Sequence, residues 1–169
     1  PCGIAVNWKT KHKTIIKALY GNPLAIWGGE FICNFKIDEK IAKILIKSSG
    51  RKKLLGDSHW LLDVIVAPFF SNKALELLIK RKNRKIFSNS SLQSTSLRLS
   101  KWSYRHVRGG FIKQPHPDYI LSKKNINLNI KPLTNHIFND MLIAWAASFT
   151  SFHGGNEVAI AKNGSLLTC

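Results

Sequence analysis

The stretch Leu61-Leu62-Asp63-Val64-Ile65-Val66-Ala67 decides the fold class, because it is an apolar run of strand length interrupted by a single carboxylate. Apolar runs of this kind are typical of strands that are buried on both faces of a parallel sheet. Helical patterns flank it at residues 38–47, where Asp38 can cap the helix, and at residues 72–80. Alternating strands and helices predict a three-layer α/β/α sandwich with a mostly parallel sheet.

Further elements are predicted on the amino-terminal side and around this strand. They are a strand at residues 1–6, a helix at 11–20, a Gly-Gly turn with a following strand within 27–35, a surface loop at 48–58, a short strand at 84–88 and a polar loop at 88–100. The prolines and glycines at the junctions favour these boundaries, since Pro cannot continue a helix.

The second half of the chain is less regular. The predicted elements are a strand at 104–114 bent at Gly109-Gly110, a connecting loop at 114–130, a helix from Leu133 or Thr134 to about Phe152, a strand at 157–161 and a hairpin turn at 162–164. In the long helix we expect four side chains to be buried: Ile137, Met141, Leu142 and Trp145.

The chain is strongly basic: 26 Lys and Arg stand against nine Asp and Glu among 169 residues, which gives a net charge of +17. Such a charge attracts anions, including nucleic acids, acidic membranes and phosphorylated small molecules. Many of the basic residues are Lys accompanied by Ile and Asn, a bias that an AT-rich genome also produces. We therefore interpret most of the charge as a solvated surface.

Common cofactor and metal motifs are absent from the sequence. No G-x-G-x-x-G or G-x-x-x-x-G-K-[ST] pattern occurs, and no zinc-deaminase pattern either. The six His are scattered, and Cys2, Cys33 and Cys169 match no zinc spacing, so we expect no metal and free thiols in a reducing compartment. No apolar run approaches the ~20 residues that cross a bilayer, which favours a cytoplasmic protein without a membrane partner.

Four places stand out as candidate binding positions, each with an ordinary structural alternative. Residues 23–29 form a loop from Pro23 to Gly28-Gly29 that contains Trp27. Either the glycines let a ligand approach the backbone beside the Trp27 ring, or the loop is an ordinary turn over a packed Trp27. Asp63 is either a structural hydrogen-bond acceptor or a ligand anchor. Residues 105–110 place two Arg and a His beside a Gly pair, and Gly154-Gly155-Asn156 follows a predicted helix, where α/β folds gather ligands.

Several short motifs follow one another in a fixed order. They are Pro1-Cys2-Gly3-Ile4-Ala5, Asn22-Pro23-Leu24-Ala25-Ile26-Trp27-Gly28-Gly29, Asp63-Val64-Ile65-Val66-Ala67-Pro68, Ala74-Leu75-Glu76-Leu77-Leu78, Lys82-Asn83-Arg84, Gly109-Gly110-Phe111-Ile112-Lys113-Gln114, Asn156 and Ala161-Lys162-Asn163-Gly164. In this order and spacing, over nearly the whole chain, they resemble the 5-aminoimidazole-4-carboxamide ribonucleotide (AICAR) transformylase domain of the bifunctional purine-biosynthesis protein.

The resemblance implies a cytidine-deaminase-like α/β/α sandwich without the zinc site, with residues 1–169 as the first subdomain of a transformylase. The family transfers a formyl group from its co-substrate 10-formyltetrahydrofolate to the 5-amino group of AICAR, giving FAICAR on the route to IMP. It acts as a homodimer whose substrates are small molecules, with IMP cyclohydrolase as the second activity of the full-length protein. The resemblance implies no metal and no nucleic-acid partner.

The resemblance also assigns individual residues. Leu24, Ala25 and Trp27 match the folate-contacting loop, while Gly28 and Asp63 match positions near the ribonucleotide. Asn156 matches the Asn that helps hold the amino nucleophile and the formyl group, and it is the catalytic candidate in this chain. We further expect Asp63 in the carboxyl half of a central buried strand, with its carboxylate facing the same cleft as Gly28 and Asn156.

The chain also departs from the family pattern. Ala25 and Trp27 stand where Ser and Phe are usual, and Gly154-Gly155 stands where Lys-Ser or a polar equivalent is usual. We expect the family's Lys-His pair, which takes part in proton transfer, ahead of Pro1, together with the cyclohydrolase domain. The second subdomain is expected after Gly164. For these reasons we expect the chain by itself to be inactive in formyl transfer.

A second hypothesis is a basic α/β module that binds nucleic acid, with Lys and Arg on phosphates and exposed aromatic rings for stacking. Such a module needs its basic residues in one stripe with aromatic residues between them. In the sequence they are scattered, and most Trp stand in apolar runs, which favours the transformylase.

Overall fold

In the computed structural model of the chain, the described residues are 2–6, 10–94, 100–116, 119, 121–126, 133–149 and 158–168. They divide into two compact units. The first joins Pro1–Gln93 to Leu128–Cys169 and holds a parallel sheet, and the second is Ser94–Asn127 and holds a single hairpin.

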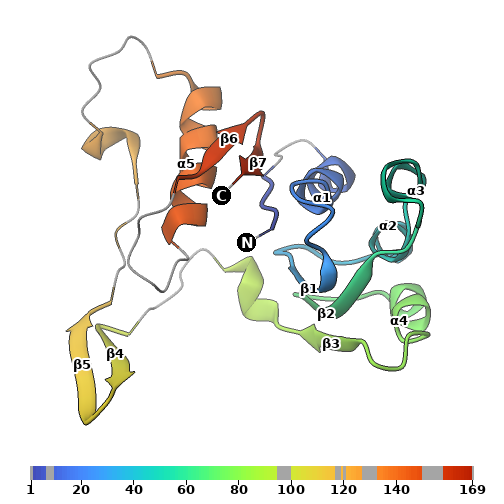
Figure 1. Cartoon of the computed structure of the whole chain (residues 1–169), viewed down its shortest axis with the longest axis horizontal. Coiled ribbons are helices and arrows are strands. Elements are labelled where there is room, and N and C mark those ends of the chain that lie inside the picture. The colour runs from blue at the N-terminus through green and yellow to red at the C-terminus, as the bar shows by residue number, and fades with distance from the viewer. Residues whose placement is uncertain are drawn as a thin grey trace. The chain divides into compact units, whose positions relative to one another are not determined.

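The parallel sheet has three strands in the order β1-β2-β3 (Figure 1). Their bounds are Trp27–Ile32 for β1, Leu61–Ala67 for β2 and Lys85–Ser88 for β3. The quoted apolar run is thus the central strand, with parallel partners on both sides, as predicted. The described residues form an α/β fold, and the finer deaminase-like layering remains a prediction.

Four helices accompany this sheet along the chain. They are α1 (Lys11–Leu19), α2 (Glu39–Ile46), α3 (Ser49–Leu55) and α4 (Asn72–Leu78). Asp38 caps α2 by accepting a hydrogen bond from the Ile41 backbone N–H, and the Ser71 hydroxyl caps α4 in the same way. The caps of α2 and α4, and the apolar face that α1 buries through Ile15 and Leu19, explain why these three helices lie where the sequence predicts them.

Helix α3 corrects the prediction of a loop at residues 48–58. Ser48 caps it by accepting a hydrogen bond from the Arg51 backbone N–H, and Gly56 ends it in the left-handed region at φ 76°. The helix buries a charged side chain rather than an apolar one, since Arg51 is 5% exposed. Its sequence therefore lacks the apolar periodicity on which the prediction depended.

The core of the first unit lies where α2 packs against α4 and β2. Ile41 and Leu45 of α2, Ile65 of β2 and Leu78 of α4 are each at most 1% exposed. Helix α1 contributes to the same cluster through Ile15 and Leu19. This cluster makes β2 the best-anchored strand, which fixes the position of any side chain that it carries.

The carboxyl-terminal part of the first unit consists of α5 (Asn135–Phe149) and the hairpin of β6 (Ile160–Lys162) and β7 (Ser165–Thr168). The predicted turn is confirmed: Asn163 and Gly164 have φ of 54° and 76°, as a tight hairpin turn requires. The Asp140 carboxylate of α5 accepts the backbone N–H of both turn residues, at 3.0 and 2.7 Å. The helix thus holds the turn.

The face of α5 that is buried is not the predicted one. Ile137 is 50% exposed and Trp145 is 38% exposed, Met141 and Leu142 are partly buried, and the buried cluster consists of Ile143, Ala147 and Leu166 of β7. The helix is apolar on most of its surface, so periodicity alone does not select a side. The strand predicted at residues 1–6 is reduced, within its described part, to one bridge between Ala5 and Ser165.

The second unit also differs from its prediction. The bent strand expected at residues 104–114 is a hairpin of two antiparallel strands, β4 (Trp102–Val107) and β5 (Gly110–Pro115). Gly109 has φ of 87° and makes the turn between them. Short 3-10 turns also occupy two predicted loops, at Ser90–Gln93 and Lys123–Asn125.

Candidate functional site

The pairing of β1 with β2 is interrupted once on each strand. The paired positions around the interruption are Trp27 with Leu61, Gly29 with Leu62, and Glu30 with Val64. The two residues left without a partner are Gly28 on β1 and Asp63 on β2. The Gly-Gly pair expected as a turn is therefore an irregularity inside β1. Bulges of this kind redirect side chains and are enriched beside active sites.

Burial along β2 shows the effect of the interruption. Leu62 is buried, and the next buried residues are Ile65 and Ala67, so the in-out alternation changes phase across Asp63. The carboxylate is thereby released from the core: its side chain is 43% exposed. Asp63 is the third of the seven residues of β2, so the expectation that it lies in the carboxyl half of the strand is wrong.

Gly28 and Asp63, the two unpaired residues, lie against each other. A Cβ atom on Gly28 would stand 3.0 Å from Oδ2 of Asp63. Gly28 also has φ of 70°, a left-handed conformation that L residues rarely adopt. Glycine is favoured here by its conformation, a Cβ would also crowd the carboxylate, and the exposed backbone of β1 is open beside it.

Asp63 is held by a guanidinium from the segment after α4. Arg81 Nη2 lies 2.5 Å from Asp63 Oδ1. Arg84 is fixed next to this pair, because its Nε donates to the carbonyl of Leu62 and its Nη1 to that of Leu78. Burial lowers the pKa of the Arg84 guanidinium, Arg81 lowers it further and Asp63 raises it. Arg84 still remains a cation at neutral pH.

The loop that the sequence assigned to folate contact presents its side chains outward. Leu24 is 76% exposed and Trp27 is 78% exposed, and Ala25 is exposed as well. The loop is held from inside by Ile26, which is 5% exposed, and by the Asn22 side chain, which accepts the Ala25 N–H at 3.3 Å. The open indole face of Trp27 on this loop offers a stacking surface.

The remaining candidates are placed as follows. Asn156 and the preceding Gly154-Gly155 lie outside the described residues, so their relation to Gly28 and Asp63 stays a prediction. Arg105 and His106 lie on β4 of the second unit. Of the predicted ribonucleotide positions, the structure brings Gly28 and Asp63 together.

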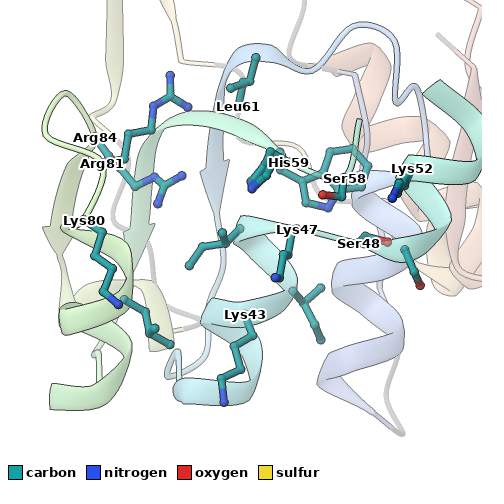
Figure 2. Close-up of a pocket in the computed structure, with 15 residues that line it drawn as sticks. Lys43, Lys47, Ser48, Lys52, Ser58, His59, Leu61, Lys80, Arg81 and Arg84 are labelled. Atoms are coloured by element: carbon teal, nitrogen blue, oxygen red, sulfur yellow. The ribbon is translucent and has the colours of Figure 1, made fainter. Parts of the chain in front are cut away.

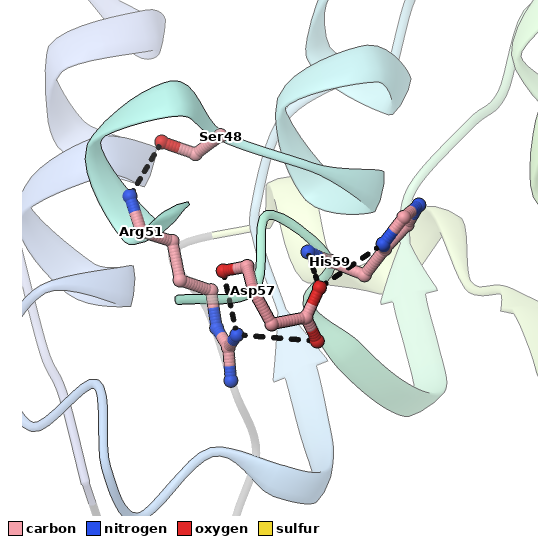
Figure 3. A network of polar contacts seen from close by, with 4 residues as sticks. All are labelled: Ser48, Arg51, Asp57 and His59. Atoms are coloured by element: carbon pink, nitrogen blue, oxygen red, sulfur yellow. Dashed lines mark hydrogen bonds and ion pairs between the residues drawn. The ribbon is translucent and has the colours of Figure 1, made fainter. Parts of the chain in front are cut away.

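A polar network orders the segment that leads into β2 (Figure 3). Arg51 donates from Nη1 to the backbone carbonyl of Asp57 at 3.0 Å, and the same Nη1 lies 3.5 Å from Oδ2 of that residue. The other carboxylate oxygen, Oδ1, accepts the backbone N–H of His59 and contacts the His59 ring. These His59 bonds, and secondarily Arg51, lower the pKa of Asp57.

Sequence reasoning missed Arg81 and the pocket that it lines. The pocket has a volume of about 980 Å³ and lies between α2, α4 and the segment before β2 (Figure 2). The only advance signal was the excess of positive charge, which we interpreted as a solvated surface.

No arrangement of three or more His, Cys, Asp or Glu suited to a metal ion occurs among the described residues. Within the same ranges, no helix has the length and hydrophobicity to cross a membrane.

Comparison with known proteins gives one consistent result. The AICARFT/IMPCHase bienzyme family matches residues 1–169. The bifunctional purine biosynthesis protein PurH of Bacillus cytotoxicus is 29% identical over 164 residues, which cover 96% of this chain and 29% of the relative. The PurH of Aquifex aeolicus is 26% identical over 99% of this chain and 29% of its own length. That of Fusobacterium nucleatum is 29% identical over 96% of this chain.

The chain thus spans less than a third of the length of these relatives. The match nevertheless runs from its first residue to its last, and it agrees with the order of motifs from which the resemblance was inferred. The chain belongs to the AICARFT/IMPCHase bienzyme family.

Proposed function

We propose that this chain is the part of a purine-biosynthesis formyltransferase that holds AICAR against Gly28 and Asp63. The observation that carries the proposal is the paired interruption of β1 and β2. It leaves one carboxylate and one bare stretch of backbone side by side, outside the hydrogen-bond ladder. The family match and the purine biosynthesis names of the relatives support the same substrate class.

The proposed roles follow from the chemistry of each group. Oδ1 of Asp63 is engaged by Arg81, while Oδ2 accepts no hydrogen bond among the described residues, so it is available to a ribose hydroxyl. Gly28 lets the ligand approach the backbone without a side chain in between. Trp27 offers its exposed ring to the pteridine of 10-formyltetrahydrofolate, with Leu24 and Ala25 on the same loop.

Catalysis in this proposal is mainly positional. The aromatic amine of AICAR is a weak nucleophile, so both reactants must be held in near-attack geometry. The oxyanion that forms at the formyl carbon needs a hydrogen-bond donor, a role that we propose for the Asn156 amide. Removing the amine proton is the task of the Lys-His pair that the resemblance places ahead of Pro1. Formyl transfer is therefore expected of the larger enzyme, a homodimer in the family, rather than of these 169 residues.

Binding of AICAR to the chain tests the proposal, with Asp63→Asn as the probe and Asp57→Asn as the matched control. Each change replaces an Arg-paired carboxylate by an amide of the same size. Loss of a charge-assisted bond weakens binding by roughly 10–100-fold, and we expect this for Asp63→Asn. The control should change the affinity less than about twofold, since Asp57 is bonded to its own loop. Equal affinities for the two variants, or no binding of AICAR by the unaltered chain, would overturn the proposal.

One observation favours a second candidate, the basic nucleic-acid module. One face of the β4–β5 hairpin carries Tyr104, 60% exposed, and Phe111, 67% exposed, and Lys113 lies 4.4 Å from the centre of the Trp102 ring. Exposed rings beside lysines suit stacking of unpaired bases. Submicromolar binding of single-stranded DNA that falls steeply with added salt would support this candidate. We expect no such binding, because the family match and the proximity of Gly28 to Asp63 support a small-molecule site in the first unit.

A further inference from the structure

The pocket beside α2 and α4 has an apolar interior and a positively charged rim. Its interior is lined by Ile44, Ile46, Trp60, Leu61 and Leu77. Six cationic side chains also line it: Lys43, Lys47, Lys52, Lys80, Arg81 and Arg84 (Figure 2). No Asp or Glu is among the lining residues. We call this site the basic pocket; at about 980 Å³, it falls within the size range of small-molecule sites.

The charge of the rim is only partly compensated by the protein. Lys43 is paired with Glu39 and Arg81 with Asp63. Lys47, Lys52 and Lys80 make no ion pair in the part of the chain that the structure describes. The carboxyl ends of α2 and α4 favour nearby cations, but two helix ends together supply about one negative charge. A net positive field therefore remains over the opening.

A second observation comes from the wall of the pocket. Trp60 is 1% exposed, and its indole Nε1 is buried without a hydrogen-bond partner among the described residues. Arg81 contributes another such atom, Nη1. Buried donors are normally satisfied by protein, water or a ligand. Both atoms are shielded from solvent while the pocket stands open, so they lie behind its wall, and the acceptor atoms of an occupant would meet the exposed ammonium groups of the rim instead.

We infer that the basic pocket is a binding site for a small amphiphilic anion, with an aromatic or aliphatic body and a phosphate, carboxylate or sulfonate group. The apolar interior takes the body, and the ammonium groups of Lys47, at the end of α2, and Lys80, just after α4, take the anionic group. The site is separate from the proposed AICAR position, because neither Gly28 nor Asp63 lines it. Arg81, which pairs with Asp63, and the neighbouring Arg84 line the basic pocket as well.

Fluorescence titration with 1-anilinonaphthalene-8-sulfonate, an aromatic sulfonate, tests the inference on the chain as it exists. The test variant is Lys47→Glu/Lys80→Glu. The matched control is Lys13→Glu/Lys40→Glu, which makes the same change of charge at two exposed lysines outside the pocket. We expect the dissociation constant of the probe to rise at least tenfold in the test variant and less than twofold in the control. Inorganic phosphate should displace the probe, and chloride at equal ionic strength should not.

Leu77→Ala provides a second variant that keeps the rim intact. It removes apolar surface from the partly buried lining of the pocket, and we expect the affinity for the probe to fall about threefold or more. Equal weakening in the two charge-reversed variants would show that net charge alone attracts the probe, and it would overturn the inference. So would unchanged binding in Lys47→Glu/Lys80→Glu. Because neither lysine contacts Asp63, AICAR binding in that variant reports separately on the proposed function.

Discussion

Two Asp–Arg pairs near the beginning of β2 differ in how fully the carboxylate is used. Asp57 accepts the backbone N–H of His59, contacts the His59 ring and pairs with Arg51. Asp63 pairs with Arg81, and its Oδ2 accepts no hydrogen bond among the described residues. A carboxylate whose bonding capacity is used within its own loop is a structural element. One that retains an open acceptor beside bare backbone is suited to a ligand.

The arginine partners differ in the same sense as their carboxylates. Arg51 is 5% exposed, lies 5.2 Å from the centre of the Trp60 ring and donates to a backbone carbonyl. The Arg81 side chain is 34% exposed, and its described contact is with Asp63. Arg51 is therefore part of the core, whereas Arg81 serves one carboxylate. Stability should depend on the first pair and ligand binding on the second.

The largest expected difference is in stability after loss of either arginine. Arg51→Ala removes a buried side chain together with its carbonyl bond and ring contact, and it should lower the free energy of unfolding by about 2–4 kcal/mol. Arg81→Ala breaks a half-exposed pair and should lower it by less than about 1 kcal/mol. Urea denaturation of the two variants measures both values. A larger loss of unfolding free energy in Arg81→Ala than in Arg51→Ala would contradict the distinction between the two pairs.

The next effect is the strain that would follow a side chain at Gly28. Gly28→Ala places Cβ 3.0 Å from Oδ2 of Asp63 at φ of 70°, and it should destabilise the chain by about 2 kcal/mol. Gly56→Ala is the control, with φ of 76° and no atom within 4 Å, and it should destabilise by about 1 kcal/mol.

A double-mutant cycle sharpens this prediction. In an Asp63→Ala background the carboxylate is gone, so Gly28→Ala should destabilise no more than Gly56→Ala. If the Gly28→Ala effect stays the same in both backgrounds, Gly28 and Asp63 are not in contact, and the proposed site loses its geometry.

The smallest effect concerns pH. The bonds from His59 lower the pKa of Asp57 below its ordinary value of 3.8. A group whose pKa is lower in the folded state stabilises the fold above its unfolded pKa and loses this contribution as the pH falls through the folded one. Stability should therefore decrease below about pH 4, and Asp57→Asn should remove part of the decrease. Urea midpoints between about pH 5 and pH 2.5 measure it; identical pH profiles would contradict the assignment.

Much of the first unit could be predicted from the sequence because its elements satisfy local rules. The apolar run of β2, the Asp38 cap of α2 and the Asn163-Gly164 turn each have a short-range physical cause. Helix α3 could not be predicted in this way. Its buried residue is Arg51, and a charged residue is read as exposed in a hydrophobicity pattern. The face of α5 was likewise set by contact with Leu166, far along the chain.

The candidate site was predictable only in part, for the same reason. The motif order indicated Gly28 and Asp63, and the structure places them in contact. The phase change in β2 could not be foreseen, since it depends on the register with β1. Arg81 and the basic pocket depend on side chains from α2, α4 and the segment before β2, which meet only after folding. Asn156 stays a prediction.

The central claim is that AICAR binds beside Gly28 and Asp63, and backbone amide chemical shifts of the labelled chain during AICAR titration test it most directly. The account predicts that the largest shift changes occur at Gly28, Gly29 and Asp63, and that they shrink in Asp63→Asn at the same AICAR concentration. Shift changes confined to Lys47, His59 and other residues of the basic pocket, or spread evenly over the lysine-rich surface, would contradict it.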